Sequence, residues 1–121
     1  MAKEIEVSAQ IISQQEYTLP PKAVGGKGFG FDVFGYAMIG SSDGDVIAKI
    51  VGLGRPGLSA SPFTVLCQTR QSENVDRGYT DQFAVQVIET GRDFFRVRIR
   101  RIDADGAGWG QKLRLDFGII N

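Results

Sequence analysis

The chain has 121 residues, of which 42% are hydrophobic, and its fourteen basic and fourteen acidic residues cancel. This composition excludes a disordered chain and argues against binding to nucleic acid or membranes through overall charge. The length predicts a single domain covering residues 1–121, long enough to bury a core.

Histidine is absent and Cys67 is the only cysteine. The first fact removes His-based acid–base catalysis, Ser-His and Cys-His nucleophiles and the usual zinc sites. Only a carboxylate-based enzyme would fit this composition, and no catalytic motif is visible, so we expect a non-enzymatic protein without cofactor or metal. Cys67 lies in the apolar run 62–67, where a small buried hydrophobic residue is expected rather than a reactive thiol.

The sequence shows neither a membrane span nor a secretion signal. No apolar run approaches the ~20 residues needed to cross a bilayer. Glu4 and Glu6 stand where a signal peptide would have its apolar core. We therefore expect a protein made in the cytoplasm without membrane insertion, a pattern that a component of a virion or other particle would share.

In chain order, residues 4–12 alternate apolar and polar side chains, which predicts a strand with one buried face. The aromatic and glycine-rich segment 29–39 follows, and its change of phase at Val33–Phe34 indicates a β-bulge or a strand buried on both sides. A turn at 40–45 and a short strand at 46–51 complete what we interpret as a hairpin over residues 29–51.

The C-terminal third carries the clearest pattern. After a strand at 63–68, three alternating runs are separated by Gly/Asp-rich turns, which predicts an antiparallel meander. Period-2 alternation places one set of side chains in the core. The set expected inside is Phe83, Val85, Val87, Phe95, Val97, Ile99, Leu113, Leu115, Phe117 and Ile119.

No ten-residue segment shows helical periodicity. Seven or eight short strands separated by Gly, Pro and Asp turns predict an all-β fold, an antiparallel β-sandwich of jelly-roll-like or related type. A closed barrel is the alternative that the sequence leaves open.

Two kinds of loop invite a functional interpretation. The glycines of residues 25–30 open a strand rather than a helix, which argues against a phosphate-binding loop. Residues 42–45 and 103–106 each pair two acids with a glycine, and such oxygen-rich loops can hold calcium. Both lack the further acid of the helix-flanked calcium loop, so plain turns are the better interpretation.

A row of basic side chains follows the predicted meander. Arg96, Arg98 and Arg100 share one face, to which the meander would add Lys112 and Arg114. A solvated face or phosphate binding would explain them. We favour a subunit interface, because like charges on neighbouring strands are destabilising unless acids of a partner oppose them. Phe34 and Tyr36 of the glycine-aromatic strand are expected to join this interface, which predicts a homo-oligomer or a component of a larger assembly.

Trp109 lies between glycines in the last turn region. Its ring would be a stacking surface for a sugar, or equally a lid over the end of the sandwich. Loops carry recognition when a rigid sheet presents them. We therefore predict a ligand or partner site at this end, formed by Arg70, Asp76, Arg77, Tyr79, Asp103, Asp105 and Trp109.

Residues 62–120 resemble the H-type lectin domain, the small β-sandwich of snail agglutinin and the discoidins. The shared pattern is a proline-led strand (62–66), an alternating strand (83–87), an aromatic-led strand (94–99) and a closing strand (113–117). The resemblance implies a trimer or hexamer that binds sugars at protomer interfaces through loop acids, an arginine and aromatics. Asp103 and Trp109 fall in the corresponding last loop, whereas the histidine of some members is absent.

Two functions are consistent with these features. The first is a self-assembling β-sandwich protein, a structural or receptor-binding component of virion or phage-tail type, since small signal-less β-sandwiches of similar composition are common there. The second is a carbohydrate-binding module of H-type lectin character with a glycan ligand.

Overall fold

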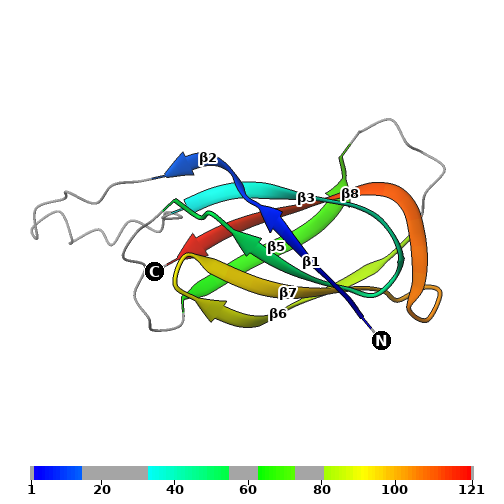
Figure 1. Ribbon diagram of the computed structural model, residues 1–121. Helices are drawn as coiled ribbons and strands as arrows, with labels where there is room; N and C mark the ends of the chain where they lie inside the picture. The colour runs from blue at the N-terminus through cyan, green and yellow to red at the C-terminus, as the bar shows by residue number, and fades with distance from the viewer. Residues whose placement is uncertain (1, 15–32, 55–62, 73–80, 121) are drawn as a thin grey trace, which may run out of the picture.

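The computed structural model describes residues 2–14, 33–54, 63–72 and 81–120, and this part of the chain folds into eight strands without a helix (Figure 1). The predicted all-β class is confirmed. The strands are β1 (Lys3–Ser8), β2 (Gln10–Gln14), β3 (Val33–Gly44), β4 (Val46–Val51), β5 (Thr64–Gln71), β6 (Phe83–Gly91), β7 (Phe94–Arg101) and β8 (Ala107–Ile120).

The strands form two four-stranded sheets packed as a sandwich. Sheet A has the order β1-β4-β7-β6, and sheet B has the order β2-β3-β8-β5. Neighbours are antiparallel except β1 and β4, which run parallel. The strands β1 and β2, β3 and β4, β5 and β6, and β7 and β8 are each consecutive in the chain but lie in opposite sheets. Both sheets therefore contain strands from the N-terminal and the C-terminal parts of the chain.

The connections differ from the predicted ones in two places. β6 and β7 form the expected hairpin, with Asp93 at a positive φ of 65° in its turn. β8 does not continue this hairpin but enters sheet B between β3 and β5, so the predicted three-stranded meander is wrong. The predicted hairpin over residues 29–51 is also wrong within its described part, because β3 and β4 lie in different sheets with only Asp45 between them.

The predicted strand at 4–12 is divided between the two sheets. The chain crosses at Ala9, whose backbone N–H donates to the carbonyl of Val51 at 2.8 Å. β2 then pairs with β3 through a register shift between Ile11 and Ser13, opposite Gly35 and Phe34. The irregularity predicted at Val33–Phe34 thus has its extra residue in the neighbouring strand.

β3 itself alternates regularly at its start. Val33 and Ala37 are fully buried, whereas Phe34 and Met38 are 38% and 43% exposed, so the strand is not buried on both sides. Its own register shifts, relative to β8, come later, between Met38 and Ser42.

The core lies between the two sheets. Phe95 of sheet A packs edge-to-face on Phe117 of sheet B, with ring centroids 5.2 Å apart. Seven of the ten side chains predicted inside are buried: Phe95, Val97, Ile99, Leu113, Leu115, Phe117 and Ile119. The other three, Phe83, Val85 and Val87, are only partly buried because β6 is the edge of sheet A.

Candidate functional site

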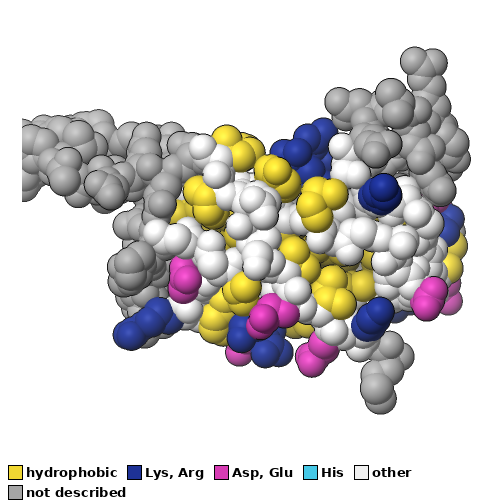
Figure 2. All heavy atoms as spheres, turned by 45° about the horizontal axis from the view of Figure 1, so that its top comes forward, with side chains coloured by type: hydrophobic (Ala, Val, Ile, Leu, Met, Phe, Trp, Pro, Cys, Tyr) yellow, Lys and Arg dark blue, Asp and Glu magenta, His cyan; other side chains and the backbone are white. Residues whose placement is uncertain are grey.

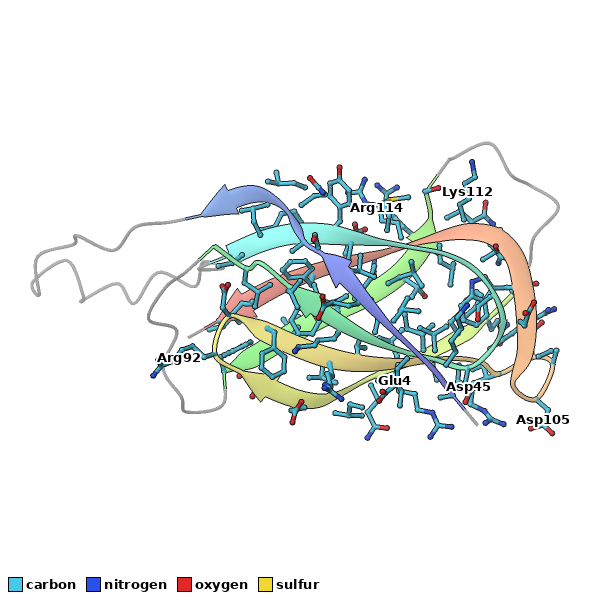
Figure 3. All side chains as sticks on the ribbon, viewed as in Figure 1. Glu4, Asp45, Arg92, Asp105, Lys112 and Arg114 are labelled. Atoms are coloured by element: carbon cyan, nitrogen blue, oxygen red, sulfur yellow. The ribbon has the colours of Figure 1, made fainter. Side chains whose placement is uncertain are left out.

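The residues predicted to form one interface lie on two opposite faces of the sandwich. Arg96, Arg98 and Arg100 project from β7 on the outside of sheet A, whereas Arg114 projects from the outside of sheet B. Figure 3 shows Lys112 and Arg114 on one side of the molecule and Glu4 and Asp45 on the other. The prediction of a single basic face is wrong, because it assumes that β8 lies beside β7 in one sheet.

Acids of the same chain oppose the arginines of β7. The Oδ2 atom of Asp45 accepts hydrogen bonds from Arg98 Nη2 at 2.7 Å and from Arg100 Nη1 at 3.3 Å. Arg96 Nε lies 3.0 Å from Glu89 Oε1, and a second carboxylate, that of Glu4, lies 3.6 Å from its Nη1. Acids of the same chain therefore already balance the arginine row. The arginines do not require acids of a neighbouring chain, which was the reason for predicting a subunit interface here.

Asp45 is the centre of this ion-pair network. It is the only residue between β3 and β4, and its side chain is 10% exposed. The Arg98 hydrogen bond, reinforced by Arg100, lowers the pKa of the Asp45 carboxyl against the opposing effect of burial. Because Arg100 also reaches Asp105 Oδ1 at 3.0 Å, the network ties the β3–β4 crossing to the turn before β8.

This network predicts a pH-dependent contribution to stability. A carboxyl with a lowered native pKa stabilises the fold above its unfolded pKa of 3.8, and this contribution disappears as the pH falls through the lower native value. Asp45→Asn should cost about 1–2 kcal/mol at pH 7, since charge-assisted bonds to half-exposed arginines are lost. Urea unfolding at pH 7 and pH 3 should show the difference from wild type narrowing at pH 3.

Asp105→Asn is the matched control, because Asp105 contacts the same Arg100 from a fully exposed side chain. Its effect should be small at both pH values. A difference between wild type and Asp45→Asn that stays constant from pH 7 to pH 3 would contradict the role given to the Asp45 carboxylate.

Trp109 closes the end of the sandwich as a buried lid. The side chain is 4% exposed, and its Nε1–H donates to the carbonyl of Gly40 at 2.8 Å. Phe83 packs against the indole edge-to-face at 5.2 Å between centroids. Gly108 allows the start of β8 to lie close to the end of β3, because a side chain at position 108 would collide with the backbone at Ser42. Of the two roles considered for the ring, the structure shows the lid and not an exposed stacking surface.

Arg101 organises the same end, and sequence reasoning missed it. Its guanidinium donates to Asp103 through Nε at 3.0 Å and to the carbonyl of Gly108 through Nη1 at 3.0 Å, and it pairs with Asp81 at 3.1 Å. The Arg101 hydrogen bond, joined by one from the backbone N–H of Gln82, lowers the pKa of Asp103. The alternation of β7 could have indicated this role, because Arg101 is in phase with the buried Val97 and Ile99 and a charged side chain at the inward end of a strand requires partners.

A shallow cavity of about 490 Å³ opens beside this cluster. Its lining combines hydroxyl, carboxylate and guanidinium groups with the edge of the lid: Ser42, Asp43, Asp81, Arg101, Gly108, Trp109 and Gly110. It is a polar recess at the place where the sequence predicted a ligand site.

The residues predicted for that ligand site are only partly brought together. Asp103 and Trp109 meet at the sandwich end through Arg101 and Gly108. Asp105 has a fully exposed side chain directed to Arg100. Arg70 lies on the outer face of sheet B. The remaining three, Asp76, Arg77 and Tyr79, lie outside the described residues.

The outer face of sheet B carries a group of exposed apolar side chains that we call the B-face patch. It consists of Ile12, Phe34, Met38, Leu66 and Ile120, which are 38–57% exposed. Figure 2 brings part of this side of the molecule forward and shows hydrophobic side chains reaching the surface. Part of this face is therefore apolar, unlike the polar, solvated outer face that an antiparallel sandwich usually presents.

A hollow lies within the patch. Phe34, Gly118 and Leu66 form one row across β3, β8 and β5. Because Gly118 has no side chain, the row leaves a recess of about 290 Å³ between the phenyl ring and the leucine. Cys67 contributes to its lining, and burial raises the pKa of this thiol to about 11.

A polar cluster lies on the same face, between and beside the rows of Phe34 and Met38. Asp116 accepts from Arg114 Nε at 2.6 Å and from Arg70 Nε at 2.8 Å. The Arg114 guanidinium also stacks on the Tyr36 ring, 3.8 Å from its centroid. Two predicted interface residues are thus held in fixed positions next to exposed apolar surface, and Arg70 belongs to this face.

Comparison with known proteins leaves the function to be argued from these sites. The chain matches no protein-family model, no curated protein and no solved structure at a significant level. The resemblance of residues 62–120 to H-type lectins therefore stays a prediction. Within the described ranges there is no helix that could span a membrane, and no group of three or more acidic or cysteine side chains is arranged to hold a metal ion.

Proposed function

We propose that this chain is a non-enzymatic, self-assembling β-sandwich protein that associates through the outer face of sheet B. Its role would be that of a structural or receptor-binding component of a particle, of the virion or phage-tail type. The observation that carries the proposal is the B-face patch, five large apolar side chains exposed on one face of one sheet.

Exposed apolar surface of this kind supports association. Scattered hydrophobic residues are normal on a monomer, but a group on one face indicates a contact surface. The neighbouring Tyr36 and Arg114 belong to residue types enriched in interfaces. Their stacking, and the pairing of Arg114 with Asp116, reduce the side-chain entropy that association would otherwise cost.

The proposal predicts that a charge in the patch disrupts assembly. Leu66 is 54% exposed on β5, so Leu66→Glu should leave the fold intact while an unpaired carboxylate opposes burial between copies. Sedimentation or light scattering should show the wild type as an oligomer and Leu66→Glu shifted to monomer by at least roughly tenfold in dissociation constant, about 1.4 kcal/mol.

Ile88→Glu is the matched control. Ile88 is 46% exposed but lies on β6 of sheet A, away from the patch, so this variant should assemble like the wild type. A wild type that stays monomeric at high concentration would refute self-assembly. Equal weakening by both variants would show that the B-face patch is not the contact surface.

Sugar binding is a second candidate, favoured by the polar cavity at the sandwich end. Carboxylates and a guanidinium around a recess suit a polyhydroxyl ligand, although the buried indole cannot stack on it. Trp109 lines this cavity and, as the only tryptophan of the chain, gives a single indole NMR signal, so titration with simple sugars tests the candidate directly. No shift at high sugar concentration would remove it.

A further inference from the structure

Within the described part of the chain, the two sheets have four edge strands: β1 and β6 in sheet A, and β2 and β5 in sheet B. An edge strand exposes backbone N–H and C=O groups that can pair with another chain, and proteins normally block such pairing with bulges, charges or short strands. The four edges of this sandwich differ clearly in this respect.

Three of the edges carry such devices. β6 has a register shift between Val87 and Glu89, and β2 has one between Ile11 and Ser13. β1 has only six residues, and three of them, Lys3, Glu4 and Glu6, are charged. Each of these edges is poorly suited to regular pairing with a further strand.

β5 has no register shift, is longer than β1, and carries its one charged residue, Arg70, near its end. Its eight residues pair with β8 without a shift, from Thr64 opposite Ile120 to Gln71 opposite Leu113. Residues 64–69 contain no charge, proline or glycine. Among residues 2–14, 33–54, 63–72 and 81–120, no strand pairs with the outer side of β5. This edge is regular, uncharged over most of its length, and bears the exposed Leu66.

We propose that β5 pairs antiparallel with β5 of a second copy about a two-fold axis, joining two B sheets into one continuous eight-stranded sheet. This inference rests on the proposed function and specifies its first contact. A two-fold contact uses the same surface on both copies, and an antiparallel strand pair is self-complementary in this way.

The geometry limits the register. A two-fold axis perpendicular to the sheet keeps each side chain on its own face, so an outward residue must lie opposite an outward residue. The pair at the axis is therefore a residue and its own copy. Centring the axis on Leu66 places two exposed leucines side by side and sets Thr64 opposite the second copy's Gln68.

The alternative centres are less favourable. An axis through Cys67 sets Leu66 opposite Gln68, and an axis through Gln68 sets it opposite the charged Arg70. Apolar cross-strand neighbours stabilise a sheet, whereas an apolar residue beside a charge gains little. With Leu66 at the centre, the row of Phe34, Gly118 and Leu66 continues into the second copy, and the two B-face patches become one surface.

Site-specific disulfide formation tests the register. On a Cys67→Ser background, Leu66→Cys places two thiols directly opposite, at about the Cβ spacing of 4.5–5.5 Å that cross-strand pairs have, from which small movements reach disulfide geometry. The control Gln68→Cys is displaced by four residues from its own copy, roughly 13 Å. Mild oxidation of the native protein should yield several-fold more covalent dimer from Leu66→Cys than from Gln68→Cys.

The outcomes separate this inference from the proposed function. If the wild type is an oligomer but Leu66→Cys gives no more dimer than Gln68→Cys, the β5 pairing is wrong while self-assembly stands. Dominant cross-linking through Gln68→Cys or through the native Cys67 overturns the Leu66-centred register. A wild type that is monomeric in sedimentation overturns both. Circular dichroism checks that each variant is folded.

Discussion

Phe95→Ala is expected to destabilise the fold by about 3–5 kcal/mol, the range for deleting a fully buried phenyl ring. Phe95 is 0% exposed in β7, an inner strand of sheet A. Its ring contacts Phe117 edge-to-face across the core, so the substitution removes a contact between sheets as well as apolar volume. Urea unfolding followed by circular dichroism measures the loss.

Phe94→Ala supplies the matched control. Phe94 is the preceding residue of β7 and points to the outer face, where the Lys49 ammonium lies 4.6 Å from its ring centroid. Its truncation should cost about 1 kcal/mol or less, as for a partly exposed ring with a surface cation–π contact. Equal losses for the two variants, or a larger loss for Phe94, would mean that the strand is turned over by one residue.

Trp109→Ala should produce a loss of similar size, about 3–5 kcal/mol. The indole is 4% exposed, so its removal leaves a cavity against Phe83 and takes the donor from the Gly40 carbonyl. Trp109→Phe separates the two effects. It keeps most of the ring and loses the hydrogen bond, which should cost about 1–3 kcal/mol.

The fluorescence of the wild type gives an independent check. Trp109 is the only tryptophan, so its emission should be blue-shifted and poorly quenched by iodide, and should move to the red on unfolding. Exposed-type emission together with wild-type stability of Trp109→Ala would contradict the lid and restore the ring as a stacking surface.

Alternation in the sequence predicted which side chains face inward but not which strands are neighbours. Leu113, Leu115 and Phe117 were assigned to the core correctly, yet β8 was placed beside β7. The reason is physical: both sheets of a sandwich direct their apolar sides to the same core, so an inward pattern is identical in either sheet. The segment around Asp45 was predicted as a hairpin turn for a similar reason. Gly and Asp residues occur both in hairpin turns and where the chain crosses between sheets, so their presence does not tell the two apart.

The candidate sites were predictable to a similar extent. Phe34, Tyr36 and Arg114 were grouped by residue type, and the structure does place them on one face. Arg96, Arg98 and Arg100 were assigned to the same face because β8 was expected beside β7. The acids that oppose them could not be predicted, because ion pairs such as that of Arg98 with Asp45 join residues far apart in the sequence. Leu66 was not singled out, since one leucine in a strand carries no sign of whether it faces solvent.

The arrangement of sheet B has a consequence for how the protein is made. β3 lies between β2 and β8, and Val33 pairs with Ile119. During synthesis the edge of β3 that pairs with β8 therefore emerges from the ribosome long before β8 does. Pairings of this kind close large loops and place β-sandwiches among the slower folders, at roughly milliseconds to seconds. Until β8 arrives, the backbone N–H and C=O groups on this edge of β3 lack their partner strand, so nascent chains need protection from aggregation in that interval.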